Sequence, residues 1–517
     1  MAAVVDIDSN GNSLVITTLR QLRTYWPLLI PIIFICRFCY YKYASPLRKY
    51  PGPFLASGSR LWKVWSTWSG HTERDHILIH EKHGPVVRIA PNELSFASPH
   101  AAREILAAGK GFHKTDFYGV FPPPENPDIF TETREDVHAV KKRYASNPYS
   151  MATMHTMSGY IEDTERLLMK KLDGMCQSPD GYCNLGNYLH YFAFDVLGEL
   201  AFSRKFGFLE AGYDIEKAIK TIDDMQWYDG IVGQIPEWDF VFRRNPLWKY
   251  IPALSTSNFL ITRMALDEIE QRKRLGKQLE RRDLMAALFD AHEKAPAAFK
   301  EGDVFAVAHG AIFAGSDSTA STMQSFCWHV LRDPRIYATL KRELDEAAAA
   351  GKLSEMPQWT EVQALPYFQA CLKEAMRIRP AVGLNITRLV PPGGAEIHGQ
   401  RFPGGTRVAL NGWVLHRDTE IFGRDATVYR PERWMEGDAK AKAMERHMFQ
   451  FGGGSHLCIG KNLALLEMNK TLPLLFRNYE MELLRPQEEP RYHSTFFVVQ
   501  EGPEIRIARR AEEVHVS

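Results

Sequence analysis

A glycine-rich loop that brings one cysteine to the start of a helix constrains this chain more than any other feature. Residues 449–465 read FQFGGGSHLCIGKNLAL, and a helical apolar pattern begins within them. Three consecutive glycines allow close approaches that a Cβ would forbid, so a flat group can lie against the chain. Cys458 precedes the helix, where free backbone N–H groups and the helix dipole favour an anionic sulfur. The loop therefore predicts a thiolate.

Two simpler interpretations of this loop compete with a thiolate ligand. One is a buried free cysteine after a glycine-rich turn, which would be preferred if the CxG stood alone. The other is a phosphate-binding loop, but Asn462 follows Lys461 where such a loop requires serine or threonine. A thiolate on haem iron has a distinct use, because it pushes electron density onto the metal and favours cleavage of an O–O bond.

The loop resembles the haem-binding signature of the cytochrome P-450 family. The matching positions are Phe451, Gly454, Cys458 and Gly460, with His456 as the basic residue two positions before the cysteine. The resemblance covers about residues 45–505. It implies haem b as the cofactor, these loop residues as its contacts, and Cys458 as the axial ligand of the iron. It also implies a mainly α fold with a small β lobe, built as a single large domain after an N-terminal membrane anchor.

Two separated motifs carry charged residues that the resemblance assigns to structural support. Glu374 and Arg377 in KEAMRIRP lie one helical turn apart and share a helix face. Alone, this spacing describes a solvated ion pair. Its position upstream of YRPERW (429–434) resembles the family's ExxR and PERF motifs. The resemblance therefore implies that Arg433 joins Glu374 and Arg377 in a buried network behind the haem loop.

A third motif, AGSDST at 314–319, lies within a long helical pattern and resembles the family's oxygen-binding motif. Its small residues would leave room for dioxygen, and an acid beside an alcohol offers a proton relay in a dry cavity. The resemblance implies catalytic roles for Asp317, Ser318 and Thr319. The family's usual threonine is Ser318 here, so either Ser318 or Thr319 carries the relay. A Ser/Thr cluster that caps or kinks a core helix is the alternative.

The resemblance also implies partners for the haem propionates and walls for a substrate cavity. Cationic partners are expected at His456 and Arg388. On the helix EDVHAVKKRY the family's WxxxR has become His138 and Lys142; Lys141 or Arg143 could substitute, and a solvated basic helix is the alternative. The implied cavity residues are Phe112, Phe121, Phe313, Leu384, Phe496 and Phe497.

Composition excludes some functions and indicates a compartment. Lys plus Arg (63) nearly balance Asp plus Glu (62), so no overall field attracts nucleic acid. Seven cysteines in 517 residues are too few for a disulfide framework, which indicates a reducing compartment.

Periodicity predicts helices at Met157–Leu172, Leu189–Leu200, Arg263–Glu280, Val304–Arg332 and Pro334–Ala350. A hairpin is expected from Val86–Ile89 and Glu93–Phe96, and further short strands between Arg388 and Val408.

The N-terminal region has its own pattern. Residues 26–41 read WPLLIPIIFICRFCYY, and basic residues follow. The run is shorter than the ~20 residues that span a bilayer comfortably, but the charges after it favour a cytosolic body. A secretory signal peptide is the alternative, although no small-residue cleavage site follows. We expect a region with a membrane anchor (1–44), a Pro/Gly linker (45–56) and a catalytic domain (57–517) on the cytosolic face of the endoplasmic reticulum.

The function implied by the resemblance is insertion of one oxygen atom from dioxygen into an apolar small molecule. The sequence after Cys458 leaves no space for a flavin domain, so NADPH-cytochrome P-450 reductase is the expected electron donor, with cytochrome b5 as a second candidate. The segments SPLRKYPGPFLA and RWMEGDAK resemble fungal microsomal members, many of which modify secondary metabolites. One alternative is a haem-thiolate ring expansase, dehydratase or isomerase, kept open by Ser318. A non-enzymatic haem sensor or anchored scaffold is another, and AGSDST argues against it.

Overall fold

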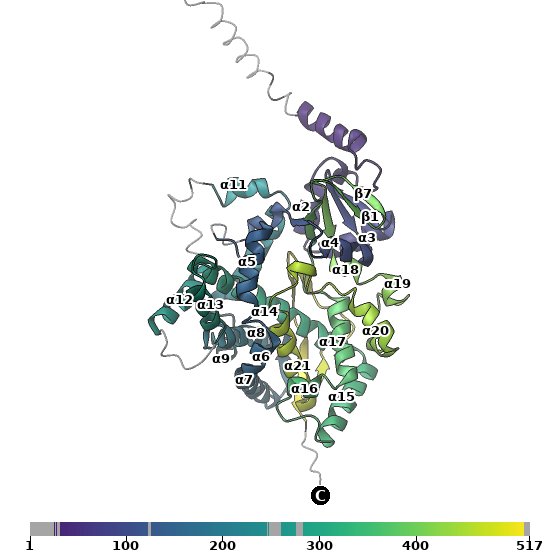
Figure 1. The fold of residues 1–517 in the computed structure, drawn as a ribbon. Helices are drawn as coiled ribbons and strands as arrows, with labels where there is room; N and C mark the ends of the chain where they lie inside the picture. The colour runs from purple at the N-terminus through teal and green to yellow at the C-terminus, as the bar shows by residue number, and fades with distance from the viewer. Residues whose placement is uncertain are drawn as a thin grey trace, which may run out of the picture.

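A long central helix organises the molecule, which the computed structural model describes at residues 25, 27, 31–121, 126–245, 247, 260–275 and 283–510. Helix α14 (Glu301–Arg332) packs against α8 (Leu185–Phe202), α12 (Leu260–Leu275) and α17 (Pro366–Ile378) (Figure 1). Nearly all of its side chains after the first turn are at least partly buried. The prediction of a helix at Val304–Arg332 is confirmed.

The ends of α14 follow from capping residues in its sequence. At the start, the N–H of Lys300 donates to Asp303 Oδ2 at 2.7 Å, which satisfies a backbone group that the helix leaves free. At the end, Asp333 starts the next helix, α15 (Pro334–Ala349), by accepting the N–H of Arg335 at 2.9 Å. Pro334 occupies the first position of α15, where its missing N–H costs nothing. These residues explain the break between the two helices.

The other predicted helices are also confirmed, with small shifts at their ends. The predicted helices at 157–172 and 189–200 correspond to α7 (Ser158–Cys176) and α8, and 334–350 corresponds to α15. The helix predicted at 263–280 corresponds to α12; residues 276–280 lie outside the described part of the chain. Further helices are α2 (Leu61–Trp68), α3 (Thr72–His83), α4 (Pro99–Leu106), α5 (Glu135–Ser146), α6 (Met151–Thr156), α10 (Ala218–Val232), α11 (Asp239–Phe242), α13 (Leu284–Lys294), α20 (Asp438–Glu445) and α21 (Lys461–Asn478).

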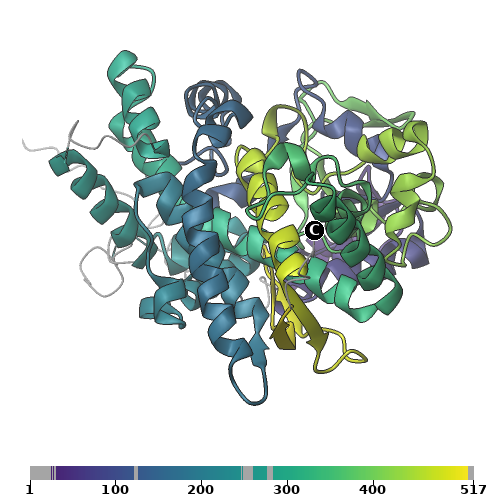
Figure 2. The same cartoon turned by 90° about the horizontal axis from the view of Figure 1, so that it is seen from below.

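Helix α21 lies deep in the body. Seen from below, the yellow segment that contains it lies between blue helices on one side and green helices on the other (Figure 2). It contacts α6 and α7 on one side and α14 and α15 on the other. This position brings the cysteine loop, which precedes α21, to the centre of the protein.

The strands form small sheets, as predicted. The largest has the order β1-β2-β8-β5-β3, and its hairpin of β1 (Val86–Ala90) and β2 (Glu93–Phe96) confirms the prediction. Strand β2 runs parallel to β8 (Arg407–Leu410), which pairs antiparallel with β5 (Ile386–Leu389). This lobe has an apolar core of its own. The other strands are β3 (His113–Lys114), β4 (Tyr182–Asn184), β6 (Ala395–Ile397), β7 (Gln400–Phe402), β9 (Tyr479–Leu483), β10 (Tyr492–Ser494), β11 (Val498–Gln500) and β12 (Glu504–Arg509).

The N-terminal segment is described only in part. Residues 31–39 are helical, and a π-helical segment, Tyr40–Ala44, follows them. Within the described ranges, no helix combines the length and the apolar character needed to cross a bilayer. Residues 26 and 28–30 of the predicted anchor lie outside those ranges. The segment predicted as a linker packs on β1, where the N–H of Arg88 donates to the carbonyl of Pro51 at 2.7 Å. All seven cysteines lie in the described part of the chain, and none of them forms a disulfide there.

Two buried carboxyl groups between α7 and α21 make stability depend on pH. Glu165 and Glu467 each have one carboxyl oxygen without a partner. Burial raises the pKa of Glu165 to about 7, and it raises the pKa of Glu467 well above its usual value. The folded state therefore holds protons that the unfolded chain releases above its own pKa of about 4.3. Stability from these groups is present at low pH and is lost as the pH rises through about 7.

Glu165→Gln and Glu467→Gln are therefore expected to raise the unfolding temperature at pH 8 and to flatten its dependence on pH. For one such group with a pKa of about 7, the gain is roughly 3 to 4 kcal/mol at most. Glu162→Gln on the same helix is the control, because the hydrogen bonds of Gln358 and Lys470 lower the pKa of Glu162 against burial. Thermal unfolding between pH 5 and 8 measures the effect. Glutamine variants that keep the wild-type slope would contradict this assignment.

Candidate functional site

The cysteine loop lies between α20 and α21 and is held from two directions. The N–H of Cys458 donates to the carbonyl of Phe451 at 2.8 Å, which closes the loop. From α5, Nζ of Lys142 donates to the carbonyls of Ser455 at 2.7 Å and Leu457 at 2.6 Å. These contacts hold Cys458 just before α21, where the sequence predicts it.

Cys458 is an exposed residue, although its thiol group is desolvated. Burial raises the pKa of the Cys458 thiol, while the amides of Gly460 and Lys461 and the charge of Lys142 lower it. The expectation that the helix start depresses this pKa is wrong for the free thiol, because desolvation is the larger effect. Coordination to a metal ion deprotonates a thiol outright and would reverse the direction.

The middle of α14 also carries an exposed residue. Ala314 is exposed, whereas Phe313 and Asp317 on other faces of the helix are buried. Because α14 contacts α21, the helix that follows Cys458, we infer that the exposed Ala314 and the exposed Cys458 face one internal space. A small residue on one side and a sulfur on the other are what a flat metal cofactor needs.

The glycine-rich run lets the loop lie against α4. At Gly454, φ is +59°, and a Cβ would stand 1.8 Å from the carbonyl oxygen of Leu106. Gly453 has an extended backbone, and its Cβ would meet only the Leu106 side chain, at 3.3 Å. The sequence predicts that the glycines let the loop approach a flat group. At Gly454, the structure shows a close approach to the end of helix α4 instead.

Gly454→Ala is expected to displace the loop and to lower both stability and haem content. The left-handed backbone alone costs about 1–2 kcal/mol, and the clash with a backbone oxygen adds to it. Gly453→Ala is the matched control and should be nearly neutral. The measurements are thermal unfolding and Soret absorbance per mole of protein. Equal behaviour of the two variants would contradict this interpretation of the loop.

Basic side chains gather beside the loop. His138 and His456 stack with ring centroids 4.3 Å apart, and Nε2 of His456 lies 3.0 Å from a carboxylate oxygen of Glu135. Burial lowers the pKa of His138 to about 3. Burial also lowers the pKa of Lys114 to about 7, and the charge of Arg388 contributes. The cluster comprises Lys114, His138, Lys142, Arg388 and His456.

This cluster fits the acidic edge of a haem. Nδ1 of His456 is buried and has no hydrogen-bond partner. Burial and the charge of Arg388 lower the pKa of Lys114 and of His456, and Glu135 is a nearby carboxylate. Such a group of basic side chains suits an anionic ligand such as a pair of propionates. The structure brings His456, Arg388 and His138, three of the predicted cofactor contacts, together beside the cysteine loop. Lys142 instead binds carbonyls of the loop.

Sequence reasoning missed part of this cluster. Nη1 of Arg388 donates to the hydroxyl of Tyr118 at 2.9 Å. Lys114 donates to the carbonyls of Ile129 and Phe130, each at 2.8 Å. No motif signals Lys114 or Tyr118, because strand pairing between β3 and β5 brings them to Arg388.

The predicted support network forms behind the loop. Glu374 accepts Nε and Nη2 of Arg377 at 2.8 Å each, and Nε of Arg433 at 2.9 Å. It also accepts the indole N–H of Trp434 at 2.9 Å. Glu374, Arg377 and Arg433 are fully buried. Nη1 of Arg433 also lies 2.9 Å from Oδ1 of Asp425, so two carboxylates neutralise the two buried guanidinium groups.

His416 connects this network to the cysteine loop, and sequence reasoning missed it. Nη1 of Arg377 donates to the carbonyl of His416 at 2.7 Å. The N–H of Phe449, at the start of the loop, donates to Nε2 of His416 at 2.8 Å. Burial, helped by the charge of Arg377, lowers the pKa of His416 to about 3, so its ring is neutral and can accept this bond. The network can therefore hold the loop through His416.

The predicted oxygen-site motif divides between two faces of α14. Ser318 lies one turn after Ala314, and its Oγ donates to the Ala314 carbonyl at 2.8 Å. Residues four apart share a helix face, so Ser318 faces the side that exposes Ala314. Thr319 is buried on another face. Of the two candidate alcohols, Ser318 is the one directed to the internal space.

Asp317 points away from that space in this structure. Its Oδ1 lies 2.7 Å from Nε2 of His190 on α8, and its Oδ2 accepts Nε2 of Gln226 on α10 at 2.8 Å. Both oxygens are therefore engaged by neighbouring helices. Sequence reasoning missed His190 and Gln226, whose signal is a polar residue within a helix that is otherwise largely apolar.

Aromatic residues form a cluster beside α14. Phe121 contacts Phe313 and Phe496, with ring centroids 6.2 and 5.3 Å apart. Phe496 also contacts Phe497 at 5.0 Å. These four predicted cavity residues come together, whereas Phe112 packs in the separate core of the sheet lobe. The structure thus removes Phe112 from the predicted cavity wall.

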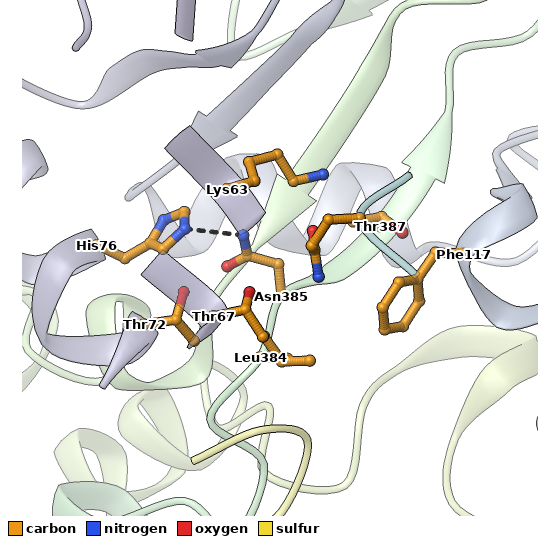
Figure 3. Close-up of a pocket in the computed structure, with 9 residues that line it drawn as sticks. Lys63, Thr67, Thr72, His76, Phe117, Leu384, Asn385 and Thr387 are labelled. Carbon is orange, nitrogen blue, oxygen red and sulfur yellow. Dashed lines mark hydrogen bonds between the residues drawn. The ribbon is translucent and has the colours of Figure 1, made fainter. Parts of the chain in front are cut away.

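Leu384 lines a different hollow, between the sheet and helices α2 and α3. Figure 3 shows it with Phe117, Thr387 and the buried amine of Lys63 around a space of about 10 Å³. His76 lies 3.0 Å from the Asn385 amide, the dashed line in the figure. Most of the residues around the hollow are polar, and it has room for about one water molecule. It is too small for an organic substrate, so the cavity role predicted for Leu384 finds no support there.

The fold and site together define a mainly helical protein with a cysteine ligand for a buried metal cofactor. The family model of cytochrome P-450 matches residues 51–507. The chain is 33% identical to the cytochrome P-450 monooxygenase cicH of Emericella nidulans over 486 residues, which cover 92% of this chain and 97% of that protein. It is also 33% identical to the pisatin demethylase of Fusarium vanettenii, covering 90% of each.

A third relative is the cytochrome P-450 monooxygenase gsfF of Penicillium aethiopicum, 32% identical over 92% of this chain and 95% of that protein. The chain therefore belongs to the cytochrome P-450 family and is a monooxygenase of the oxidoreductase class. Membership implies haem with thiolate ligation of its iron, which the Cys458 loop and the adjacent cations fit.

Proposed function

We propose that this monooxygenase hydroxylates, epoxidises or otherwise oxidises an apolar small molecule of fungal secondary metabolism. The observation that carries the proposal is Cys458 itself, an exposed residue whose thiol is desolvated and which lies beside a cluster of basic side chains. Haem b, when bound there, supplies the activation of dioxygen. The side chains of this chain supply the rest, because they hold the cofactor, orient the substrate and exclude water.

The side chains have separate roles in this proposal. Cys458 holds the iron, while His456, Arg388 and Lys114 neutralise the propionates. The Ser318 hydroxyl, beside the exposed Ala314, holds a proton at the internal space, and Asp317 replenishes it. Phe121, Phe313, Phe496 and Phe497 exclude water and orient an apolar substrate.

A membrane location of the protein is part of the proposal. Apolar side chains are exposed on α2 and α11, among them Trp65, Trp68, Phe240 and Phe242. The two elements lie at the end of the molecule that carries the N-terminal helix (Figure 1), and Arg60 joins them to each other through Glu237 at 2.8 Å. An apolar surface beside an apolar N-terminal run favours anchoring to the cytosolic face of the endoplasmic reticulum. Electrons then come from NADPH through the membrane-bound reductase, with cytochrome b5 as a second donor.

The test is product analysis with isotopically labelled dioxygen. Candidate metabolites are first screened for shifts in the spin state of the haem, and those that bind are incubated with the reductase and NADPH. One labelled oxygen atom per product and consumption of NADPH are expected. A product without label, formed without NADPH, would contradict oxygen insertion and favour the ring expansase, dehydratase or isomerase alternative.

A further inference from the structure

Gln226 joins two parts of the site that the sequence treats as separate. Its side chain is completely buried on α10. Nε2 donates to Oδ2 of Asp317 at 2.8 Å, and Oε1 accepts the backbone N–H of Phe497 at 2.8 Å. One amide group therefore bridges the acid of α14 and the segment that carries Phe496 and Phe497.

The segment 494–498 is fastened to its surroundings by backbone contacts. The carbonyl of Phe496 accepts the N–H of Gly383 at 2.9 Å, and the N–H of Val498 donates to the carbonyl of Ala381 at 2.8 Å. Helix α10 packs closely on it, since a Cβ on Gly230 would stand 2.3 Å from the carbonyl oxygen of Thr495. Movement of this segment would therefore be transmitted to α10.

The same segment lies against the aromatic cluster. Phe496 contacts Phe121 at 5.3 Å and Phe130 at 5.1 Å. A substrate that enters this cluster has to displace these rings, because the interior is close-packed. Displacement of Phe496 pulls on the neighbouring N–H of Phe497, the donor to Gln226.

The second partner of Asp317 reaches toward water. His190 is partly exposed, at 13% of its side chain, while Asp317 is at 2%. Asp317 is thus held by His190, which is partly exposed to solvent, and by Gln226, which binds the segment that carries Phe496 and Phe497. Its neighbour Ser318 faces the internal space. A turn of the Asp317 side chain away from Gln226 would therefore connect the solvent side to the Ser318 side.

We propose that Gln226 is a positioning residue that couples occupancy of the aromatic cluster to release of Asp317. With the cluster empty, Gln226 holds Asp317 away from Ser318. Displacement of the 496–497 segment removes the partner of Oε1, the amide of Gln226 shifts, and Asp317 is freed to carry a proton from His190 toward Ser318. This inference rests on the proposed monooxygenase function, and it adds a control of proton supply by substrate.

The test compares the haem-loaded, substrate-free wild type with Gln226→Met, which has a similar shape and lacks both hydrogen bonds. Gln234→Met is the matched control, because Gln234 is also buried and donates only to the carbonyl of Gly230. With reductase, each NADPH oxidised supplies two electrons, which with two protons reduce dioxygen to hydrogen peroxide. Gln226→Met is expected to raise substrate-free peroxide release about tenfold, the effect of losing one hydrogen bond to a charged group. Gln234→Met is expected to match the wild type.

Hydrogen exchange of residues 490–500 provides a readout besides activity. Gln226→Met is expected to speed exchange there, because the N–H of Phe497 loses its acceptor. In an Asp317→Asn background, Gln226→Met should still speed exchange but should no longer change peroxide release. If exchange speeds up while peroxide release stays at the wild-type level, Gln226 is only structural and the proposal is overturned.

A second variant and a spectrum distinguish failure of this proposal from failure of the haem site. If Gln226→Met does not load haem, Gln226→Asn replaces it; this side chain keeps the amide but is too short to reach both partners, so the same two changes are expected. A thiolate-type carbon monoxide spectrum in each variant shows that the haem site is intact. Loss of that spectrum in the wild type would refute the proposed function, whereas a normal spectrum with unchanged peroxide release refutes only the coupling.

Discussion

Replacing Glu374 with glutamine is expected to destabilise the folded protein by about 3 to 5 kcal/mol and to leave little haem-loaded enzyme. Glu374 is the carboxylate that pairs with both Arg377 and Arg433, and all three are fully buried. Glutamine keeps the shape and one acceptor but leaves the Arg377 guanidinium without its counter-charge and Arg433 with Asp425 alone. Through His416, the same change loosens the start of the cysteine loop at Phe449.

The measurements for Glu374→Gln are thermal unfolding and the yield of haem per mole of purified protein. Glu445→Gln is the control, because Glu445 pairs with Lys373 at the surface, where an ion pair contributes at most about 1 kcal/mol. A Glu374→Gln protein as stable and as fully loaded as Glu445→Gln would refute the supporting role of the network.

Replacing Ser318 with alanine is expected to lower product formed per NADPH by about 100-fold, within the range for loss of a positioned proton donor. Ser318 is the alcohol that shares the exposed face of Ala314, and its Oγ is already held at the Ala314 carbonyl. Oxygen consumption continues, because electron supply does not depend on this hydroxyl. The electrons are then released as hydrogen peroxide.

Thr319→Val is the matched control for Ser318→Ala. Thr319 is buried on another face of α14, and valine preserves its shape, so product per NADPH should stay close to wild type. Product, NADPH and peroxide are measured together for both variants. If Thr319→Val uncouples the reaction and Ser318→Ala does not, the relay has been assigned to the wrong alcohol.

Much of the fold could be predicted because its helices are long and have regular apolar patterns. The predicted boundary between α14 and α15 agrees with the structure, since Asp333 and Pro334 mark a helix start. The cysteine loop and the Glu374 network could be found because their residues sit at fixed spacings in short motifs. The hairpin at 86–96 was predictable from Pro91 and Asn92 between two short apolar runs.

The direction of Asp317 could not be predicted from the motif that contains it. It depends on how α8 and α10 are rotated against α14, because His190 and Gln226 come from those helices. Packing between helices decides that rotation, and a single sequence does not record it. Phe112 was misplaced for a related reason: the pairing of the sheet carries it into the core of the sheet lobe. The pKa of the free Cys458 thiol was misjudged because helix position was considered without burial.

The central claim, that Cys458 is the thiolate ligand of a haem in an oxygen-activating enzyme, is tested most directly by the carbon monoxide difference spectrum of the reduced protein. The wild type is expected to show the red-shifted Soret band typical of a thiolate ligand. Cys458→Ser should lose that band, even if it retains some haem. A wild type without the shift, or a Cys458→Ser protein that keeps it, would contradict the assignment.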